Sequence, residues 1–124
     1  MKQNILETLL VFTYTLLMQE KYVKASSVLG VLYSIAPDNV NVLRQYAVSL
    51  LQINNPEKAL ECTQQLLVLE RSPHRQVMAR HLHASALWQL GKADEATDFL
   101  QNATHCIDGT ASIFNEATPI LLEK

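Results

Sequence analysis

The chain has 124 residues and a formal net charge of -2, and 48% of its residues are hydrophobic and 18% are charged. This length is enough for one domain with a buried core. Ten basic and twelve acidic residues are spread along the chain without a basic stripe, which argues against nucleic acid as a partner. Only three Gly and four Pro are present, which favours helices with short connections over a many-stranded sheet.

The sequence predicts six helices in three consecutive pairs. The first pair is expected at about 5–19 and 23–36, and Pro37 ends it because a residue before proline disfavours helical backbone. The second pair is expected at about 40–53 and 56–70, with Pro56 in the first helical turn, where a missing N–H costs nothing. The third pair is expected at about 75–90 and 93–107, with Ser72 as N-cap and Gly91 at the C-terminal end of its first helix.

Three alanines stand in similar surroundings at the junction of each pair. Ala25 and Ala59 are 34 residues apart, and Ala96 follows after 37 more. The three additional residues fit into the connection at 71–76, where a loop insertion costs little. Apolar residues recur at helical spacing beside these alanines, for example Leu43, Tyr46, Ala47 and Leu50. One pair cannot bury such a stripe alone, so the pairs are expected to stack.

These positions resemble the tetratricopeptide repeat over about residues 5–107. The matching residues are Tyr22, Ala25, Leu29, Leu32 and Pro37; then Tyr46, Ala47, Leu50 and Ala59; then Ala84, Leu87, Gly91, Ala96, Leu100 and Ala103. The resemblance implies an all-α fold, with three helix–turn–helix repeats in a right-handed solenoid. The repeats would span about 5–39, 40–74 and 75–108 of a single domain, 1–124. A short C-terminal capping segment at 109–124 would cover the last repeat with apolar residues such as Phe114 and Leu121.

The size and the three-repeat layout also resemble the small YscY-type chaperones of bacterial type III secretion. That resemblance implies a cytoplasmic chaperone that holds a small secreted or export-apparatus protein and supports assembly of the export apparatus. Two other readings stay open. One is a structural scaffold subunit that joins partners which are each stable alone. The other is a small helical enzyme, although no residue pattern in the sequence indicates one.

In tetratricopeptide stacks the first helix of each pair lines the concave groove. By that register the predicted partner-binding residues are Leu10, Tyr14, Leu17, Met18, Arg44, Val48, Leu51, Met78, His81, Ser85 and Trp88. The same register adds Glu7, Asn41, Gln52 and Gln89 to the lining. Tyr, Trp and Arg dominate binding energy at protein interfaces, and Met adapts to varied surfaces. Ordinary packing of Tyr14, Met18 or Trp88 against neighbouring helices is the alternative reading.

The groove departs from the tetratricopeptide domains that clamp a C-terminal carboxylate. Those domains need Lys, Asn and Arg at positions that hold Leu10, Tyr14, Gln45, Met78 and Leu82 in this chain. An apolar groove suits an extended or helical segment that buries hydrophobic side chains. An unfilled apolar groove also makes self-association possible.

No pattern for a cofactor, metal or nucleophile is found. His81 and His83 are two residues apart, so they point away from each other on a helix, and neither has a further ligand at zinc spacing. We therefore expect no metal, no cofactor and no enzymatic activity. Cys62 and Cys106 are expected to be small core residues in a reducing compartment, with a disulfide as the alternative. No signal peptide or membrane-spanning stretch is predicted, so we expect a cytoplasmic protein without membrane insertion.

Overall fold

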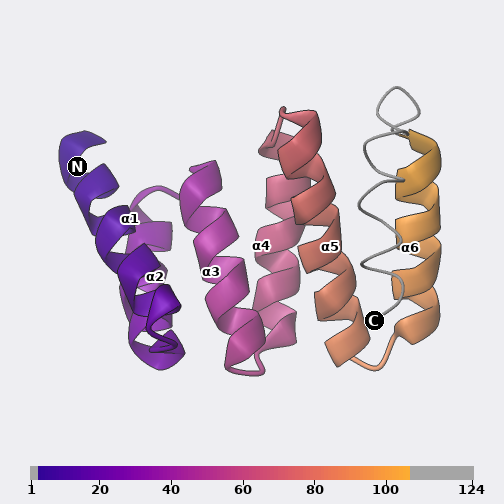
Figure 1. Cartoon of the computed structure of the whole chain (residues 1–124), viewed down its shortest axis with the longest axis horizontal. Coiled ribbons are helices and arrows are strands. Elements are labelled where there is room, and N and C mark those ends of the chain that lie inside the picture. The colour runs from indigo at the N-terminus through magenta and orange to yellow at the C-terminus, as the bar shows by residue number, and fades with distance from the viewer. Residues whose placement is uncertain (1–2, 107–124) are drawn as a thin grey trace.

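The structure is a computed structural model that describes residues 3–106, and these residues form six α-helices and no strand (Figure 1). The helices are α1 (Gln3–Met18), α2 (Tyr22–Ile35), α3 (Val40–Gln52), α4 (Pro56–Leu69), α5 (Pro73–Gln89) and α6 (Ala93–Cys106). Each predicted helix agrees with the observed one to within two residues at either end, so the all-helical prediction is confirmed for this part of the chain. The predicted capping segment at 109–124 lies outside the described residues.

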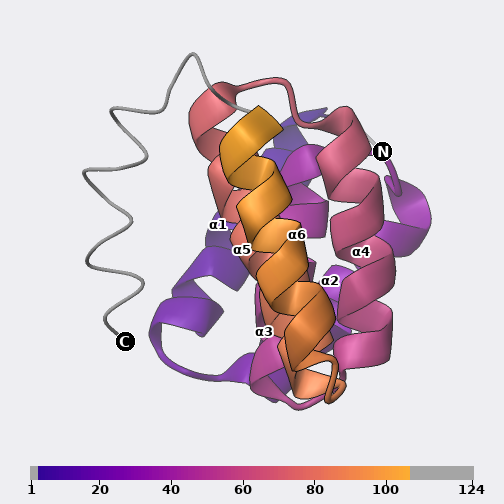
Figure 2. The same ribbon diagram turned by 90° about the vertical axis from the view of Figure 1, so that its right-hand side faces the viewer.

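Each helix packs against the next one along the chain, and the first helices of the pairs also contact one another. Contacts join α1 to α3 and α3 to α5, in addition to every sequential pair from α1–α2 to α5–α6. Figure 1 shows the helices side by side in chain order, and Figure 2 shows the same arrangement from its α6 end. We call α1, α3 and α5 the odd row, and α2, α4 and α6 the even row. None of the helices in residues 3–106 is both long and apolar enough to cross a membrane.

The turns within the three pairs share one backbone geometry. Each contains one residue with positive φ, and these are Glu20 (61°), Asn54 (63°) and Gly91 (83°). The next N–H then donates to a carbonyl five residues earlier: Lys21 to Leu16 at 2.9 Å, Asn55 to Leu50 at 2.8 Å, and Lys92 to Leu87 at 2.9 Å. This is the hydrogen bond of a Schellman motif, which satisfies a helix-terminal carbonyl and reverses the chain. The role predicted for Gly91 at this helix end is confirmed.

The three junction alanines are buried where the helices of a pair come together. Ala25 and Ala59 are 0% exposed and Ala96 is 2% exposed. Each lies five residues after the positive-φ residue of its turn. Ala25 and Ala59 belong to a continuous core that extends from α1 to α5 and includes the fully buried Leu29 and Leu43. Ala96 belongs to a smaller cluster with Ala84 and Leu87.

Helix capping follows the prediction except at one position. Pro56 begins α4 as expected, after Asn55, whose side chain accepts a hydrogen bond from the N–H of Lys58. Ser72 stands at the N-cap of α5, but its hydroxyl makes no capping hydrogen bond. Its backbone N–H instead donates to the Glu70 carboxylate, with 3.4 Å between Ser72 N and Glu70 Oε1. The side chain of Gln76 ties α5 back to the end of α4 by donating to the Leu67 carbonyl at 3.0 Å.

Cys62 is buried as predicted, and His83 is buried as well. Cys62 is 0% exposed, and burial raises the pKa of its thiol to about 11, which makes it unreactive at neutral pH. His83 is 8% exposed, and its Nδ1 lies 2.9 Å from the Thr63 hydroxyl oxygen of α4. Burial and then the charge of Arg80 hold the pKa of His83 below its usual value. The side chain of Cys106 lies outside the described side chains.

Ala59→Glu is expected to unfold the protein or to lower its free energy of unfolding by about 4 kcal/mol or more, because a carboxylate would be forced between packed helices. Urea denaturation followed by circular dichroism measures this. Gln64→Glu adds the same charge on an exposed position of α4 and serves as the control. A well-folded Ala59→Glu protein would show that this alanine does not lie at a close helix contact.

Gly91→Ala is expected to lower the free energy of unfolding by about 1 kcal/mol, because an L-residue is strained at positive φ. A Cβ at Gly91 would meet no atom within 4 Å, so the backbone alone accounts for the loss. Glu20→Gly should change stability in the opposite direction, since it relieves the same strain in the first turn. Equal stability of the wild type, Gly91→Ala and Glu20→Gly in thermal denaturation would contradict the role given to these turns.

Candidate functional site

A cleft lies between α1 and α3, among residues that were predicted to line the groove. It has a volume of about 320 Å³ and is lined by Glu7, Leu10, Val11, Tyr14, Asn41 and Gln45. Four of these six were predicted to line the groove: Glu7, Leu10, Tyr14 and Asn41. The contacts between α1 and α3 therefore bring together side chains that are about 30 residues apart in the sequence.

Four large predicted groove residues are exposed. Tyr14 is 56% exposed, Met18 66%, Met78 52% and Trp88 63%. Ser85 of α5 is exposed as well. Tyr14, Met18 and Trp88 are therefore not core residues. More than half the surface of each large side chain is open to solvent, and such apolar surface is available to a partner.

The other predicted groove residues are more buried. Leu10 and Leu51 are each 7% exposed and belong to the core. Leu17, Arg44, Val48 and His81 are half-buried. Leu10 thus lies at the bottom of the α1–α3 cleft, and Leu51 contributes to packing rather than to an exposed surface. Burial also lowers the pKa of His81.

Two glutamines join neighbouring helices of the odd row. The Gln45 side chain of α3 donates to the Leu10 carbonyl of α1 at 3.2 Å and accepts a hydrogen bond from the Thr13 hydroxyl. The Gln89 side chain of α5 donates to the Leu51 carbonyl of α3 at 3.1 Å. These bonds occupy both the donor and the acceptor of the Gln45 amide. The two glutamines hold the odd row together.

Arg44 is paired and is not a free cation of the groove. Its Nη2 lies 3.0 Å from Oε2 of Glu70, which is 6% exposed, and its Nη1 donates to the Asn41 side chain at 2.8 Å. Burial by itself would raise the pKa of Glu70, but the hydrogen bonds from Arg44 and from the Ser72 N–H outweigh it and hold the pKa below its usual value. The pair therefore joins α3 to the end of α4 and contributes little net charge to the groove.

Sequence reasoning missed Val11, which is 66% exposed and lines the α1–α3 cleft. Its spacing was the available signal, because Val11 follows Glu7 by four residues and precedes Tyr14 by three, and so shares their side of the helix. The buried carboxylate of Glu70 gave no such signal. Its partner Arg44 is 26 residues away, and only the packing of α3 against α4 makes the pair.

No family model matches the chain, and no curated protein matches it at significant similarity. The resemblance to tetratricopeptide repeats therefore stays a prediction from the sequence pattern. Within residues 3–106, no three His, Cys, Asp or Glu side chains are grouped so that they could hold a metal ion. The chemistry that the odd row offers is an apolar surface with hydrogen-bonding groups at its edges.

Glu70→Gln is expected to lower the free energy of unfolding by about 1–3 kcal/mol at pH 7, because the Arg44 guanidinium loses its buried charged partner. Since the folded-state pKa of Glu70 is depressed, its contribution is present above the usual carboxyl pKa and is lost as the pH falls through the folded-state value. The difference between wild type and variant should therefore shrink as the pH is lowered from 5 towards 3. A difference that is constant across this range in urea denaturation would contradict the assignment.

Proposed function

We propose that the chain is a three-repeat tetratricopeptide protein whose odd-row face binds an apolar segment of another protein. The observation that carries the proposal is the α1–α3 cleft, with Tyr14 exposed at its edge and Leu10 at its bottom. The bound segment would insert apolar side chains there and extend over Met18 and the exposed face of α5. Helical and extended segments both bind apolar grooves in this way.

The repeat assignment is supported by the recurrence of one turn. The positive-φ residues Glu20, Asn54 and Gly91 are separated by 34 and 37 residues, and so are the three buried alanines. In each turn, the N–H after the positive-φ residue donates to the carbonyl five residues earlier. A helix–turn–helix unit with a period near 34 residues is the pattern of tetratricopeptide repeats.

The choice of an apolar partner segment is supported by the chemistry of the odd row. Its exposed large apolar side chains are Ile5, Val11, Phe12, Tyr14, Met18, Met78 and Trp88. Arg44 is paired with Glu70, so it adds little net charge to this face. Tyr and Trp act as anchors at interfaces, and Met adapts to partners of different shape. A partner segment that matches this surface is apolar and prone to aggregate when it is free.

We infer a chaperone role for this binding, on the resemblance to the small YscY-type chaperones of type III secretion. The client would be a small secreted or export-apparatus protein that is held in the cytoplasm before export. A chaperone of this kind needs no cofactor and performs no chemical step. A scaffold subunit within a larger complex would use the same face for a partner that is stable by itself, and the client's stability distinguishes the two roles.

Tyr14→Ala and Trp88→Glu are each expected to weaken partner binding by about 2 kcal/mol or more while leaving the helical circular dichroism spectrum unchanged. Val23→Ala is the matched control, because Val23 is a 68% exposed apolar residue on the even row. Isothermal titration calorimetry with the purified partner measures the affinities. An equal loss of partner affinity in Val23→Ala, or unchanged affinity in both Tyr14→Ala and Trp88→Glu, would contradict the proposal.

The partner for this titration would come from a pull-down with tagged full-length protein from lysate of its source, followed by light-scattering mass of the eluted complex. A single small protein at fixed stoichiometry that aggregates when purified alone would support the chaperone role. Partners that are each soluble and folded alone would support the scaffold role instead. Capture that persists in the Tyr14→Ala, Trp88→Glu double variant would place the contact elsewhere.

A further inference from the structure

The side of α1 that faces away from α3 is not covered by another helix within residues 3–106. Figure 1 shows α1 and α2 at one end of the row of helices, so nothing in this part of the chain takes on α1 the place that α2 takes on α3 and α4 takes on α5. Equivalent positions in α1, α3 and α5 follow from the spacing of the three turns, which is 34 and then 37 residues. Each exposed residue of α1 can therefore be compared with its counterparts in α3 and α5.

Three positions that are exposed in α1 are buried in both α3 and α5. They are Thr8, Phe12 and Thr15 in α1; Val42, Tyr46 and Ser49 in α3; and Ala79, His83 and Ala86 in α5. Phe12 is 51% exposed, whereas Tyr46 is 9% and His83 is 8% exposed. Ile5, three residues before Thr8, is also 51% exposed and lies on the same side of the helix. We call Ile5, Thr8, Phe12 and Thr15 the outer stripe.

In the second and third pairs, the preceding even-row helix covers the position of Phe12. The Tyr46 side chain packs against α2, where a Cβ added at Gly30 would lie 3.4 Å from the Tyr46 hydroxyl oxygen. The His83 ring packs against α4, with 2.9 Å between its Nδ1 and the Thr63 hydroxyl oxygen. A short connection joins each covering helix to the helix it covers, so the two run antiparallel. The helix that covers this position is thus antiparallel and places a small residue opposite a large ring.

The outer stripe itself alternates large and small side chains. If a second α1 is placed antiparallel beside the first, with the two copies of Leu10 level along the helix axes, Phe12 lies opposite Thr8 and Ile5 lies opposite Thr15. Each large side chain then fits beside a small one of the other copy, as Tyr46 fits beside Gly30. The arrangement has two-fold symmetry, so the same fit occurs twice.

The polar groups of the outer stripe already have partners inside α1. The Thr8 hydroxyl donates to the Asn4 carbonyl at 2.8 Å, and the Thr15 hydroxyl donates to the Val11 carbonyl at 3.0 Å. Burying these threonines therefore leaves neither hydroxyl without a hydrogen bond. Glu7 is the only charged residue of α1, and it lines the α1–α3 cleft on the other side of the helix. Two copies can meet along the outer stripe without bringing like charges together.

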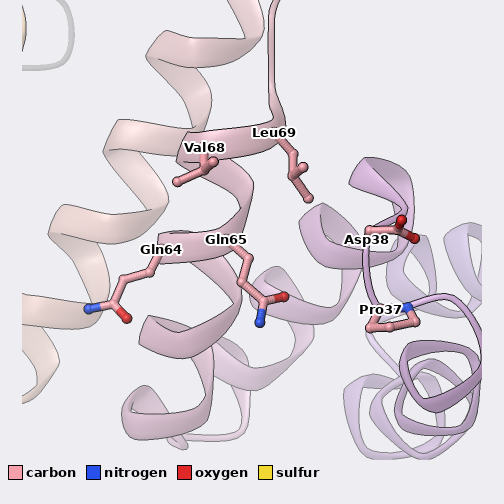
Figure 3. A pocket seen from close by; sticks show the side chains of 6 residues that line it. All are labelled: Pro37, Asp38, Gln64, Gln65, Val68 and Leu69. Carbon is pink, nitrogen blue, oxygen red and sulfur yellow. The ribbon is translucent and has the colours of Figure 1, made fainter.

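Exposed apolar residues of α2 add to the uncovered surface at this end of the row. Val31 is 60% exposed and Ile35 is 46% exposed. Each is two residues from Tyr33, which contacts Gln65 of α4, so about 200° of helix rotation places both away from α4. The equivalent positions in α4 hold Gln65 and Leu69, which point across a cleft towards the α2–α3 connection (Figure 3). The end of the row is thus apolar at a position where α4 has a polar side chain.

We propose that the outer stripe of α1 binds the same stripe of a second copy of this chain, in an antiparallel pair about a two-fold axis. Each α1 takes for the other copy the place that α2 takes on α3. An uncharged surface that is complementary to itself is what a two-fold contact requires. The outer stripe shares no residue with the α1–α3 cleft, so dimerisation and binding of a partner segment use different side chains.

Head-to-tail stacking of α6 on α1 of another copy fits this surface less well. The α6 residue at the position of Gly30 is Gln101, a larger polar side chain that would meet Phe12. Its amide would be buried in an apolar contact, which costs free energy. Head-to-tail stacking is also open-ended and produces chains of molecules instead of dimers. The size of the assembly therefore distinguishes the two modes.

The test is the mass of the full-length protein, measured by light scattering over a range of protein concentrations. We expect a monomer–dimer equilibrium with no larger species. Phe12→Glu should weaken dimerisation at least about tenfold, because an apolar contact is lost and a carboxylate is buried against the α1 helix of the second copy. Val68→Glu places the same charge on an exposed apolar residue of α4 and should leave the equilibrium unchanged.

A second substitution tests the antiparallel register. Thr8→Lys alone should also weaken dimerisation at least about tenfold, because an ammonium is buried beside an apolar ring. In the double variant Thr8→Lys, Phe12→Glu, each new ammonium lies opposite a new carboxylate of the other copy. Dimerisation of the double variant should therefore recover at least about threefold relative to Phe12→Glu.

A monomer at every concentration would overturn the proposal, and so would equal dimerisation of the wild type and Phe12→Glu. Larger assemblies that Gln101→Lys abolishes would assign the contact to head-to-tail stacking instead. Tyr14→Ala should leave dimerisation unchanged, and loss of the dimer in that variant would place the contact in the odd-row groove. Because Thr8 and Phe12 are exposed, circular dichroism should show the wild-type spectrum for their variants, and lost dimerisation then reports on the outer stripe itself.

Discussion

The close approach of helices at three buried alanines is the constraint on which the rest of this structure depends. Ala25, Ala59 and Ala96 lie where two helices of a pair meet, and a larger side chain there would push the helices apart. The turn before each alanine reverses the chain through one residue of positive φ and a hydrogen bond from the next N–H to the carbonyl five residues earlier. Together, the turn and the methyl side chain fix how far apart successive helices lie and how the pairs are stacked.

Within the odd row, side-chain hydrogen bonds join neighbouring helices, while large apolar side chains are exposed to solvent. Gln45 and Gln89 each satisfy a carbonyl of the neighbouring odd-row helix, and Arg44 pairs with the buried Glu70. These contacts restrict movement of the helices that present Tyr14 and Trp88. A surface held in place before binding loses less conformational entropy when a partner arrives, which supports affinity without additional contact area.

The two rows offer different chemistry to their surroundings. The odd row presents exposed Tyr, Trp and Met side chains and a neutralised arginine. The even row presents a cleft of about 620 Å³ between α4 and the α2–α3 connection, in which Gln64, Gln65 and Asp38 lie beside a small apolar surface.

The sequence by itself determined the helices and their pairing, because Pro37, Pro56 and Gly91 act on the backbone next to them and the alanine spacing repeats. It also placed Glu7, Leu10, Tyr14 and Asn41 on one surface, and the α1–α3 cleft contains all four. It could not determine that Leu10 is buried while Tyr14, four residues later on the same apolar helix, is exposed. That difference, the link from Gln45 to Leu10, and the cleft between α4 and the α2–α3 connection were decided only by tertiary structure, because each depends on how segments far apart in sequence lie against one another.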